Sequence, residues 1–158
     1  MPYSINVFAQ TGSRVMEING NFSYRPPLGW EVTEFPGLKY KVVYGPDEEN
    51  FRININFIDE YHNGSLHNYV NQSLFLIEPF FEEYRLIERK EFRTNSGIFG
   101  EQVIIINRQY GFLLRQTFYF LQLSNNRHIV ITCSVLDKVA ARYTSIFEES
   151  IKTFELIK

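Results

Sequence analysis

The chain has 158 residues, the usual size of a single domain, and its 44% hydrophobic and 22% charged residues exclude a disordered or fibrous protein. Sixteen Lys and Arg against eighteen Asp and Glu give a formal net charge of −2, so there is no basic excess to attract nucleic acid. No apolar run approaches the roughly 20 residues that cross a bilayer. We therefore predict no nucleic-acid partner and no transmembrane segment.

The first 21 residues are mostly polar and contain glycine, which predicts a flexible or partly ordered lead-in over 1–21 and a single domain over 22–158. Within the lead-in, the segment Val7-Phe-Ala-Gln10 resembles the end of a signal peptide. The opening residues have neither a charged start nor an apolar stretch long enough for a signal peptide, so this similarity alone does not identify one. We nevertheless expect an extracytoplasmic location in preference to a cytoplasmic one. The chain would be secreted, or tethered by a lipid on a signal upstream of this sequence.

Alternating apolar and polar residues predict four strands in the first part of the domain, over 22–25, 30–35, 38–44 and 51–57. Pro36 and Gly37 make a hairpin-type connection between the second and third of them. The polar segment 45–50 is predicted to be the turn before the fourth strand. That strand places four apolar side chains on one side, namely Phe51, Ile53, Ile55 and Phe57.

A helix is predicted next, after a loop over 59–64. Ser65 is a good N-cap because its hydroxyl can accept a hydrogen bond from a free amide of the first turn. Apolar residues then recur at spacings of three and four until Pro79 ends the helix. The stripe that should face the sheet consists of Leu66, Tyr69, Val70, Leu74 and Ile77.

The second half of the chain predicts four consecutive strands, over 84–94, 98–107, 112–123 and 128–135. The turns between them are too short to cross the sheet, so neighbouring strands should be antiparallel. The first of the four is rich in charged residues, which is typical of an edge strand. Asp137 is predicted to cap a final helix with the apolar stripe Ala140, Tyr143, Phe147, Ile151 and Phe154.

This order of elements predicts an α+β fold with a central, mostly antiparallel sheet covered by helices. The chain contains no Gly-x-Ser-x-Gly, His-Glu-x-x-His, Gly-x-Gly-x-x-Gly or phosphate-loop pattern. Serine hydrolases, zinc proteases and nucleotide-binding enzymes therefore lack their local signatures here. Alternation groups the single cysteine, Cys133, with Ile129, Ile131 and Val135, which predicts a buried thiol with a structural role.

The segment before the first helix contains the best candidate for chemistry. Asp59, Glu60, His62 and His67 lie close together in the sequence, and carboxylates with imidazoles could bind a divalent ion. Their spacing matches no known metal pattern, however, so the favoured interpretation is an ordinary solvated loop beside a helix start. We predict no bound metal.

A second candidate surface is the turn at 45–50, where three acidic residues are adjacent: Asp47, Glu48 and Glu49. Such a tip could contact a protein partner. A solvated hairpin end is the commoner meaning of a short run of like charges. Both interpretations remain open at this stage.

Taken in order, several segments resemble the PsbP family and its wider fold group, which includes the Ran-GTPase nucleotide-release factor and small bacterial envelope lipoproteins. The similarity begins with Phe22-Ser-Tyr-Arg-Pro-Pro-Leu-Gly-Trp30 and continues through Tyr44-Gly-Pro46, Ser65-Leu66-x-x-Tyr69 and Ile151-x-x-Phe154. It covers about residues 22–157, and the order of segments carries it more than any single motif.

This resemblance implies an α/β/α sandwich and no cofactor, because proteins of the family act as accessory or binding proteins. We therefore expect a non-catalytic binding or accessory module whose partner is a protein, with a small ligand as a further option. Two other hypotheses remain. One is an enzyme that uses Asp59, Glu60 and His62 around a pocket between the first helix and the sheet. The other is a regulatory partner of a small GTPase.

Overall fold

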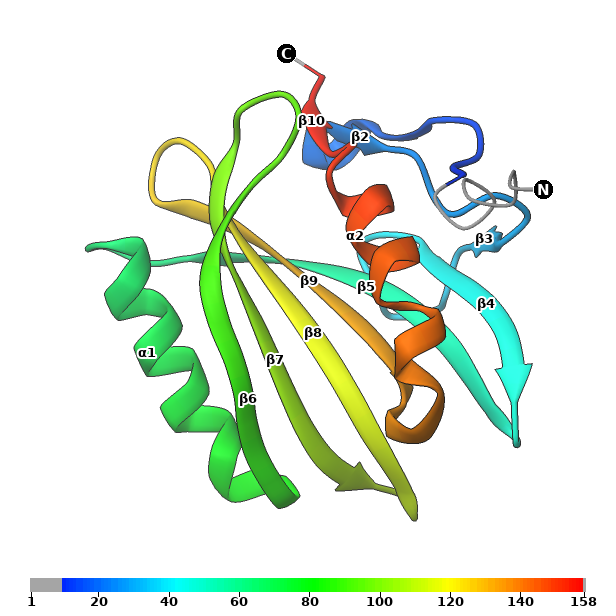
Figure 1. The fold of residues 1–158 in the computed structure, drawn as a ribbon. Coiled ribbons are helices and arrows are strands. Elements are labelled where there is room, and N and C mark those ends of the chain that lie inside the picture. The colour runs from blue at the N-terminus through cyan, green and yellow to red at the C-terminus, as the bar shows by residue number, and fades with distance from the viewer. Residues whose placement is uncertain (1–9, 158) are drawn as a thin grey trace, which may run out of the picture.

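The computed structural model describes residues 10–157, and within them the chain forms a seven-stranded sheet, a three-stranded sheet and two α-helices (Figure 1). Residues 1–9 of the predicted lead-in, which include Val7-Phe-Ala9 of the signal-like segment, lie outside the described residues. The elements in chain order are β1 (Val15–Glu17), η2 (Ile18–Gly20), β2 (Phe22–Tyr24), β3 (Glu31–Thr33), β4 (Val42–Glu48), β5 (Phe51–Tyr61), α1 (Leu66–Ile77), η3 (Glu78–Phe80), β6 (Glu82–Arg93), β7 (Phe99–Gln109), β8 (Phe112–Gln122), β9 (Arg127–Leu136), η4 (Asp137–Arg142), α2 (Thr144–Ile151) and β10 (Glu155–Leu156).

The large sheet has the strand order β3-β4-β5-β9-β8-β7-β6, and every neighbouring pair is antiparallel. The predicted meander is confirmed, since β6, β7, β8 and β9 follow one another through tight turns. The charged strand β6 lies at an edge, as predicted. The pairing of β5 with β9 joins the first three strands of the sheet to the meander, although β5 and β9 are far apart in the sequence. The α+β class with an antiparallel sheet covered by helices is thus confirmed.

One face of the large sheet is covered by α2 and the three-stranded sheet, which stand in front of it in Figure 1. Alternate residues of β5 and β9 point to this face, including Phe57, Ile131 and Cys133, and all are buried there. Phe22 and Phe154 stack over them with ring centroids 4.9 Å apart. Burial of this many aromatic and branched side chains is the main source of stability on this face.

The opposite face is covered by α1, which begins at the predicted cap: the Ser65 hydroxyl accepts a hydrogen bond of 3.1 Å from the amide of Asn68. The predicted helix stripe is confirmed, because Leu66, Tyr69, Val70 and Leu74 are buried and Ile77 is partly buried against them. They pack in a second core cluster with Val103, Ile105, Phe120 and Val130. None of the helices in 10–157 combines the length and the apolar character that crossing a membrane requires.

Some predicted boundaries in the first half were wrong, two of them at the ends of β4. The strand predicted over 38–44 begins only at Val42, and Leu38 is 48% exposed. Tyr40 instead turns inward, and its hydroxyl donates a hydrogen bond to Asp59. The polar turn predicted over 45–50 is shorter, because β4 continues to Glu48 through an irregular pairing that lets an extra residue bulge out. Only Glu49 and Asn50 form the turn, both with positive φ, as a two-residue hairpin requires.

The end of the chain also differs from the prediction. Asp137 does not cap an α-helix; it begins the short 3-10 helix η4, and its carboxylate accepts a bond of 3.0 Å from Arg115. The predicted apolar stripe is nevertheless buried as a whole, although its residues are spread over η4, the residue between η4 and α2, α2 itself and Phe154, three residues after α2. Of the three-stranded sheet, only β2 was predicted, as the strand over 22–25. β1 falls within the predicted lead-in, and β10 has two residues, too few to carry a readable period.

Candidate functional site

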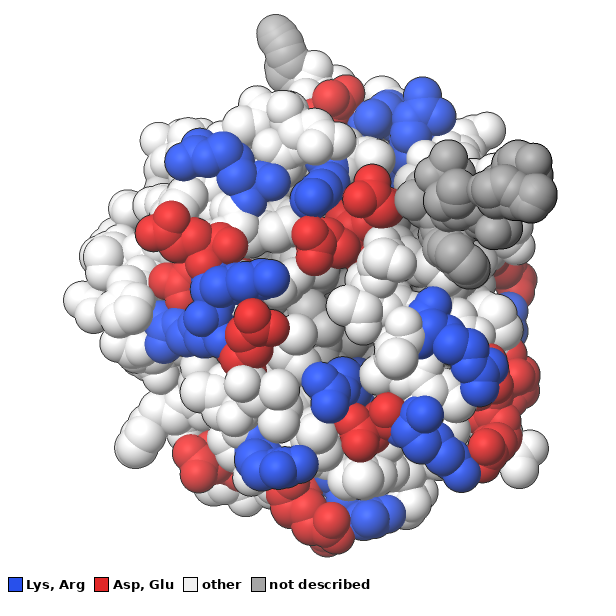
Figure 2. All heavy atoms as spheres, viewed as in Figure 1, with Lys and Arg blue, Asp and Glu red and all other residues white. Residues whose placement is uncertain are grey.

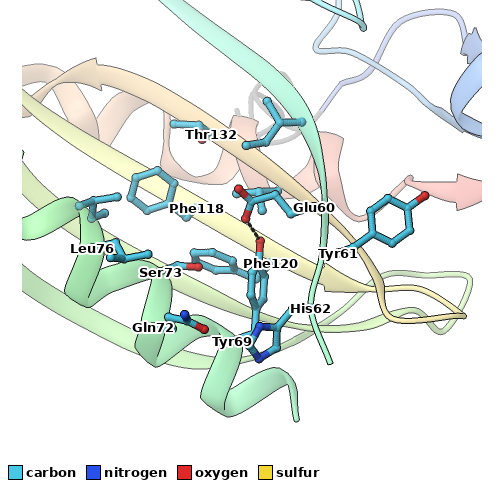
Figure 3. A pocket seen from close by; sticks show the side chains of 13 residues that line it. Glu60, Tyr61, His62, Tyr69, Gln72, Ser73, Leu76, Phe118, Phe120 and Thr132 are labelled. Atoms are coloured by element: carbon cyan, nitrogen blue, oxygen red, sulfur yellow. Dashed lines mark hydrogen bonds between the residues drawn. The ribbon is translucent and has the colours of Figure 1, made fainter. Parts of the chain in front are cut away.

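A groove of about 550 Å³ lies between α1 and the part of the sheet that α1 leaves uncovered. Its walls are mainly apolar: Ile58, Leu76, Ile77, Phe118, Phe120 and Val130. Figure 3 shows Leu76 and Ser73 on the helix side, with Phe118 and Phe120 on the strand side. A hollow of this size and composition is typical of sites for small molecules.

The groove exists because α1 is one helix on a wide sheet. Its buried stripe packs on β7 and β8, and Val130 of β9 is the farthest strand residue in that cluster. β5 has the same alternation as its neighbours, so it presents a side chain to this face at every second residue. Ile58 is one of these side chains, and it is 44% exposed because no helix lies above it. The fold leaves apolar sheet surface open along one side of α1.

One end of the groove is polar. Glu60 of β5 accepts a short hydrogen bond from the hydroxyl of Tyr69, which reaches it from α1 (Figure 3). The ring of His62 lies 5.3 Å from the ring of Tyr69. Burial first, and then the nearby Glu60 carboxylate, raise the pKa of Tyr69 far above its usual value. The hydroxyl therefore stays protonated and acts as the hydrogen-bond donor to Glu60.

A buried imidazole lies beneath this polar end. His128 of β9 pairs with Glu60 in the sheet register, is 1% exposed and stacks on Tyr69 at 4.4 Å. Within the described chain, neither of its ring nitrogens has a hydrogen-bond partner of normal geometry. Burial lowers the pKa of His128, and nearby His62 adds to this, while Glu60 opposes it. The ring therefore behaves as a neutral, aromatic support for Tyr69.

The structure separates the residues that the sequence places together around 59–67. Asp59 and Glu60 lie in β5 and not in a loop, because β5 continues to Tyr61 by pairing with the start of β9. Adjacent strand residues point to opposite faces, and Asp59 accordingly faces away from the groove. His67 is on the far side of α1, where it contacts Arg89 and Glu101. Only Glu60 and His62 of the four line the groove.

Asp59 is instead part of an ion cluster beside the other core. Its carboxylate accepts hydrogen bonds from Lys39 at 2.7 Å, from Arg127 at 2.7 Å and from Tyr40. Partial burial acts to raise the pKa of Asp59, but these three donors outweigh it and hold the pKa below its usual value. Across residues 10–157, no three His, Cys, Asp or Glu side chains are grouped so that they could hold a metal ion.

The acidic residues near the β4–β5 turn are largely engaged within the chain. Asp47 and Glu48 belong to β4. Glu48 accepts bonds from Tyr143 at 2.6 Å and Arg142 at 3.1 Å, and Glu49 pairs with Lys138 at 2.6 Å. Burial and this contact with Glu48 raise the pKa of Tyr143 to about 12. Two of the three carboxylates therefore tie the hairpin to η4 and to the residue before α2.

Cys133 is fully buried in the first core cluster, as predicted, and burial raises the pKa of its thiol well above the usual value. Charged side chains on the α2 side of the molecule are mixed in sign, as Figure 2 shows. Neither feature forms a site.

Tyr69 and His128 complete the candidate site, and the sequence indicated them only as members of a helix stripe and a strand. A signal was present: both are polar residues at positions that alternation or helical spacing places inside. Which carboxylate Tyr69 would reach depended on the pairing of β5 with β9, and no local pattern reports that pairing.

Comparison with known proteins places the fold. No protein-family model matches the sequence, and no curated protein matches it either. Several solved structures match along most of the chain. The cyanobacterial PsbP protein CyanoP from Synechocystis sp. PCC 6803 has a TM-score of 0.67 and 11% identity, over 99% of this chain and 97% of CyanoP.

Two other bacterial structures are similar to the same extent. LpqN, which is involved in cell envelope biogenesis of Mycobacterium tuberculosis, has a TM-score of 0.66 and 12% identity, over 93% of this chain and 86% of LpqN. The protein of unknown function PA94 from Pseudomonas aeruginosa has a TM-score of 0.64 and 10% identity, over 91% of this chain and 96% of PA94. The chain thus has the PsbP-like fold, and at these identities the likeness shows the fold alone.

Proposed function

We propose that this domain is a non-catalytic binding module and that its binding site is the groove between α1 and strands β5, β8 and β9. The observation that carries the proposal is the exposed apolar surface at Ile58 and Leu76, which flank a groove of about 550 Å³ with a mainly apolar lining. Apolar surface left open in this way usually marks a binding site. Its burial by a ligand would be favourable by about 25 cal/mol per Å².

The occupant that fits best is an apolar small molecule. Sites for such ligands have volumes of about 300–1,000 Å³ and a few polar groups that fix orientation, and this groove has both. A stable protein interface needs about 800 Å² on each partner, which is more surface than a hollow of this kind supplies. The protein partner expected from the sequence therefore remains a prediction for some other surface, and a regulatory contact with a small GTPase is a hypothesis of the same kind.

The enzyme hypothesis has less support than binding. It needs Asp59, Glu60 and His62 around one pocket, but the Asp59 carboxylate is on the other face, held by Lys39 and Arg127. Glu60 is hydrogen-bonded to a tyrosine whose raised pKa makes it a poor acid. This arrangement is suited to orienting a ligand and not to moving protons.

An extracytoplasmic location belongs to the same proposal. It is supported by the structural likeness to LpqN, which is involved in cell envelope biogenesis. Fractionation of cells that express the full gene, with immunodetection of this domain, tests it: recovery in the cytosolic fraction alone would contradict the location and leave the groove proposal intact.

The binding proposal is tested with the neutral fluorophore N-phenyl-1-naphthylamine. We expect its fluorescence to rise on titration with the native protein, because the dye enters apolar hollows. Ser73 of α1 lines the groove, so Ser73→Trp should fill it and weaken dye binding at least about tenfold. Ser145→Trp places the same side chain at an exposed position of α2 and serves as the matched control.

Two outcomes would overturn the proposal. Equal loss of dye binding in both tryptophan variants would show that the dye does not occupy the groove. Absence of dye binding together with a dimer that Ser73→Trp dissociates, seen by sedimentation velocity, would show that the groove is covered by a second copy of this chain.

A further inference from the structure

The groove contains a single carboxylate and no cationic partner for it. Among the residues between 10 and 157 that line the groove, none is a lysine or an arginine. Glu60 is the only acidic residue of the lining, and it is exposed to the groove opening. The charge of this apolar site is therefore set by one group.

The bonding of Glu60 is incomplete compared with that of the carboxylates around it. Its Oε1 accepts the Tyr69 hydroxyl, which is a neutral donor. Within the described part of the chain, no lysine, arginine or histidine nitrogen lies within ion-pair distance of Glu60. The adjacent Asp59 has two cationic partners, Lys39 and Arg127, and Glu101 at the other side of α1 has Arg89 at 2.6 Å. Glu60 is the carboxylate of this region that still has capacity for a charged donor.

Aromatic rings line the groove from its polar end, at Tyr69, along the strand side. Tyr69 stacks on His128 at 4.4 Å and meets Phe120 edge to face at 5.7 Å. Phe118 continues this wall, 6.0 Å from Phe120. The faces of aromatic rings attract cations, and the attraction grows when the cation is desolvated. Carboxylate and rings therefore favour the same sign of charge.

We propose that the groove selects amphiphilic molecules that carry a positively charged amine or ammonium head on an apolar chain. The head would lie at Glu60 and Tyr69, and the chain would lie along Phe118, Phe120 and Leu76. An anionic amphiphile would instead bring its charge to Glu60 with no cation in the lining to offset the repulsion. This inference rests on the proposed function, since it specifies which ligands the groove binds.

The test compares three small molecules that share one chain and differ in head group: octylammonium, octanol and octanoate. Each displaces N-phenyl-1-naphthylamine from the native protein at pH 7, and the displacement gives its affinity. We expect octylammonium to bind about tenfold more tightly than octanol, because a charge-assisted hydrogen bond to Glu60 is stronger than a neutral one. Octanoate should be the weakest of the three.

Glu60→Gln keeps the shape of the side chain and its acceptor for Tyr69 but removes the charge. It should lower octylammonium affinity about tenfold, to the level of octanol, and leave octanol affinity unchanged. Glu91→Gln removes a charge from the exposed edge strand β6 and should alter none of the three affinities, which controls for the net charge of the protein.

The results separate this inference from the proposal beneath it. If the dye binds in the groove but octylammonium binds no better than octanol, or keeps its advantage in Glu60→Gln, the charge selection is wrong and the groove remains a binding site. If the dye does not bind, or Ser73→Trp and Ser145→Trp affect it equally, the binding site itself is wrong and this inference falls with it.

Discussion

The two faces of the large sheet are built from the same strands but differ in how completely other elements cover them. The face beneath α2 and the three-stranded sheet is closed, and its carboxylate, Asp59, is bound by two cations and a tyrosine. The face beneath α1 is covered over only part of its width. The carboxylate on its open side, Glu60, has a single neutral donor, whereas Glu101 on the covered side is bound by Arg89. Asp59 and Glu60 are consecutive residues, so the contrast between them comes from the two faces and not from the local sequence.

The difference separates structural polar groups from groups that are available to a ligand. A polar group that serves the fold alone is expected to have its bonding capacity filled by the protein, because an unmet buried group costs about 1–3 kcal/mol. Glu60 is exposed, so water can fill its remaining capacity in the free protein, and beside open apolar surface that capacity is available to a ligand. The predictions below use pairs of substitutions to test whether the two faces differ in this way.

The largest difference is expected between phenylalanines on the two faces. Phe57 is 4% exposed and packs against Tyr24 with ring centroids 4.5 Å apart. Phe57→Ala should lower the free energy of unfolding by about 3–5 kcal/mol, through lost burial and a cavity. Phe118→Ala, in the wall of the groove, should cost only about 1 kcal/mol because its ring is only partly buried. Urea denaturation with unchanged m-values measures both, and equal losses would contradict the contrast.

The second comparison uses the neighbouring carboxylates. Asp59→Asn should lower stability at pH 7 by about 1–3 kcal/mol, because Lys39 and Arg127 lose their charged partner. Glu60→Gln should change stability by less than about 0.5 kcal/mol. Unfolding midpoints in urea at pH 7 give both values, and a Glu60→Gln loss as large as that of Asp59→Asn would mean that Glu60 is a structural group.

The contribution of Asp59 to stability also depends on pH. The folded-state pKa of Asp59 is lowered from its ordinary value of 3.8, so its contribution is fully present above that value and is lost as the pH falls through the folded-state pKa. At pH 7 the Asp59→Asn variant should be less stable than the native protein. This difference in the free energy of unfolding should become smaller as the pH falls below 3.8.

A smaller effect is expected from His128. Burial lowers its folded-state pKa from the ordinary value of 6.5, so the unfolded chain binds a proton first as the pH falls, and stability declines below pH 6.5. The groups that face this ring are Glu60, His62 and Tyr69. His128→Phe keeps the stack on Tyr69 and should flatten the decline between pH 6.5 and 5 in urea titrations. A decline of the same slope in the variant would assign it to another group.

The smallest effect is expected at the exposed member of the ion cluster. The Lys39 side chain is 58% exposed although its Nζ lies 2.7 Å from Asp59. Exposed ion pairs contribute little, because solvent screens them. Lys39→Ala should lower stability by less than about 0.5 kcal/mol, and by less still in 1 M salt. A larger loss would mean that Lys39, and not the more buried Arg127, holds Asp59 in place.

Most of the fold was predictable because its elements carry a clear period. The four-strand meander, the helix with its Ser65 cap and the burial of Cys133 all follow from alternation, helical spacing and turn residues. The errors lie where a side-chain contact replaced a local rule. Asp137 bonds Arg115 instead of capping a helix, and Tyr40 turns inward to Asp59 before β4 begins.

The candidate site was predictable only in part. The sequence directed attention to Glu60, His62 and a pocket between the first helix and the sheet, and the groove lies there. It also grouped Asp59 and His67 with them, because nearness in sequence was the only distance available. A strand places neighbours on opposite faces, so the treatment of 59–61 as a loop led directly to that error.

The sequence by itself determined the class of fold, the direction of each strand in the meander and which helix stripes are buried, because these follow from contacts between residues close in the chain. Only the tertiary structure decided that β5 pairs with β9 and that α1 leaves part of the sheet open. It likewise brought Tyr69 and His128 to Glu60. These features depend on surfaces that meet across long sequence separations, and their energy comes from packing that no local pattern records.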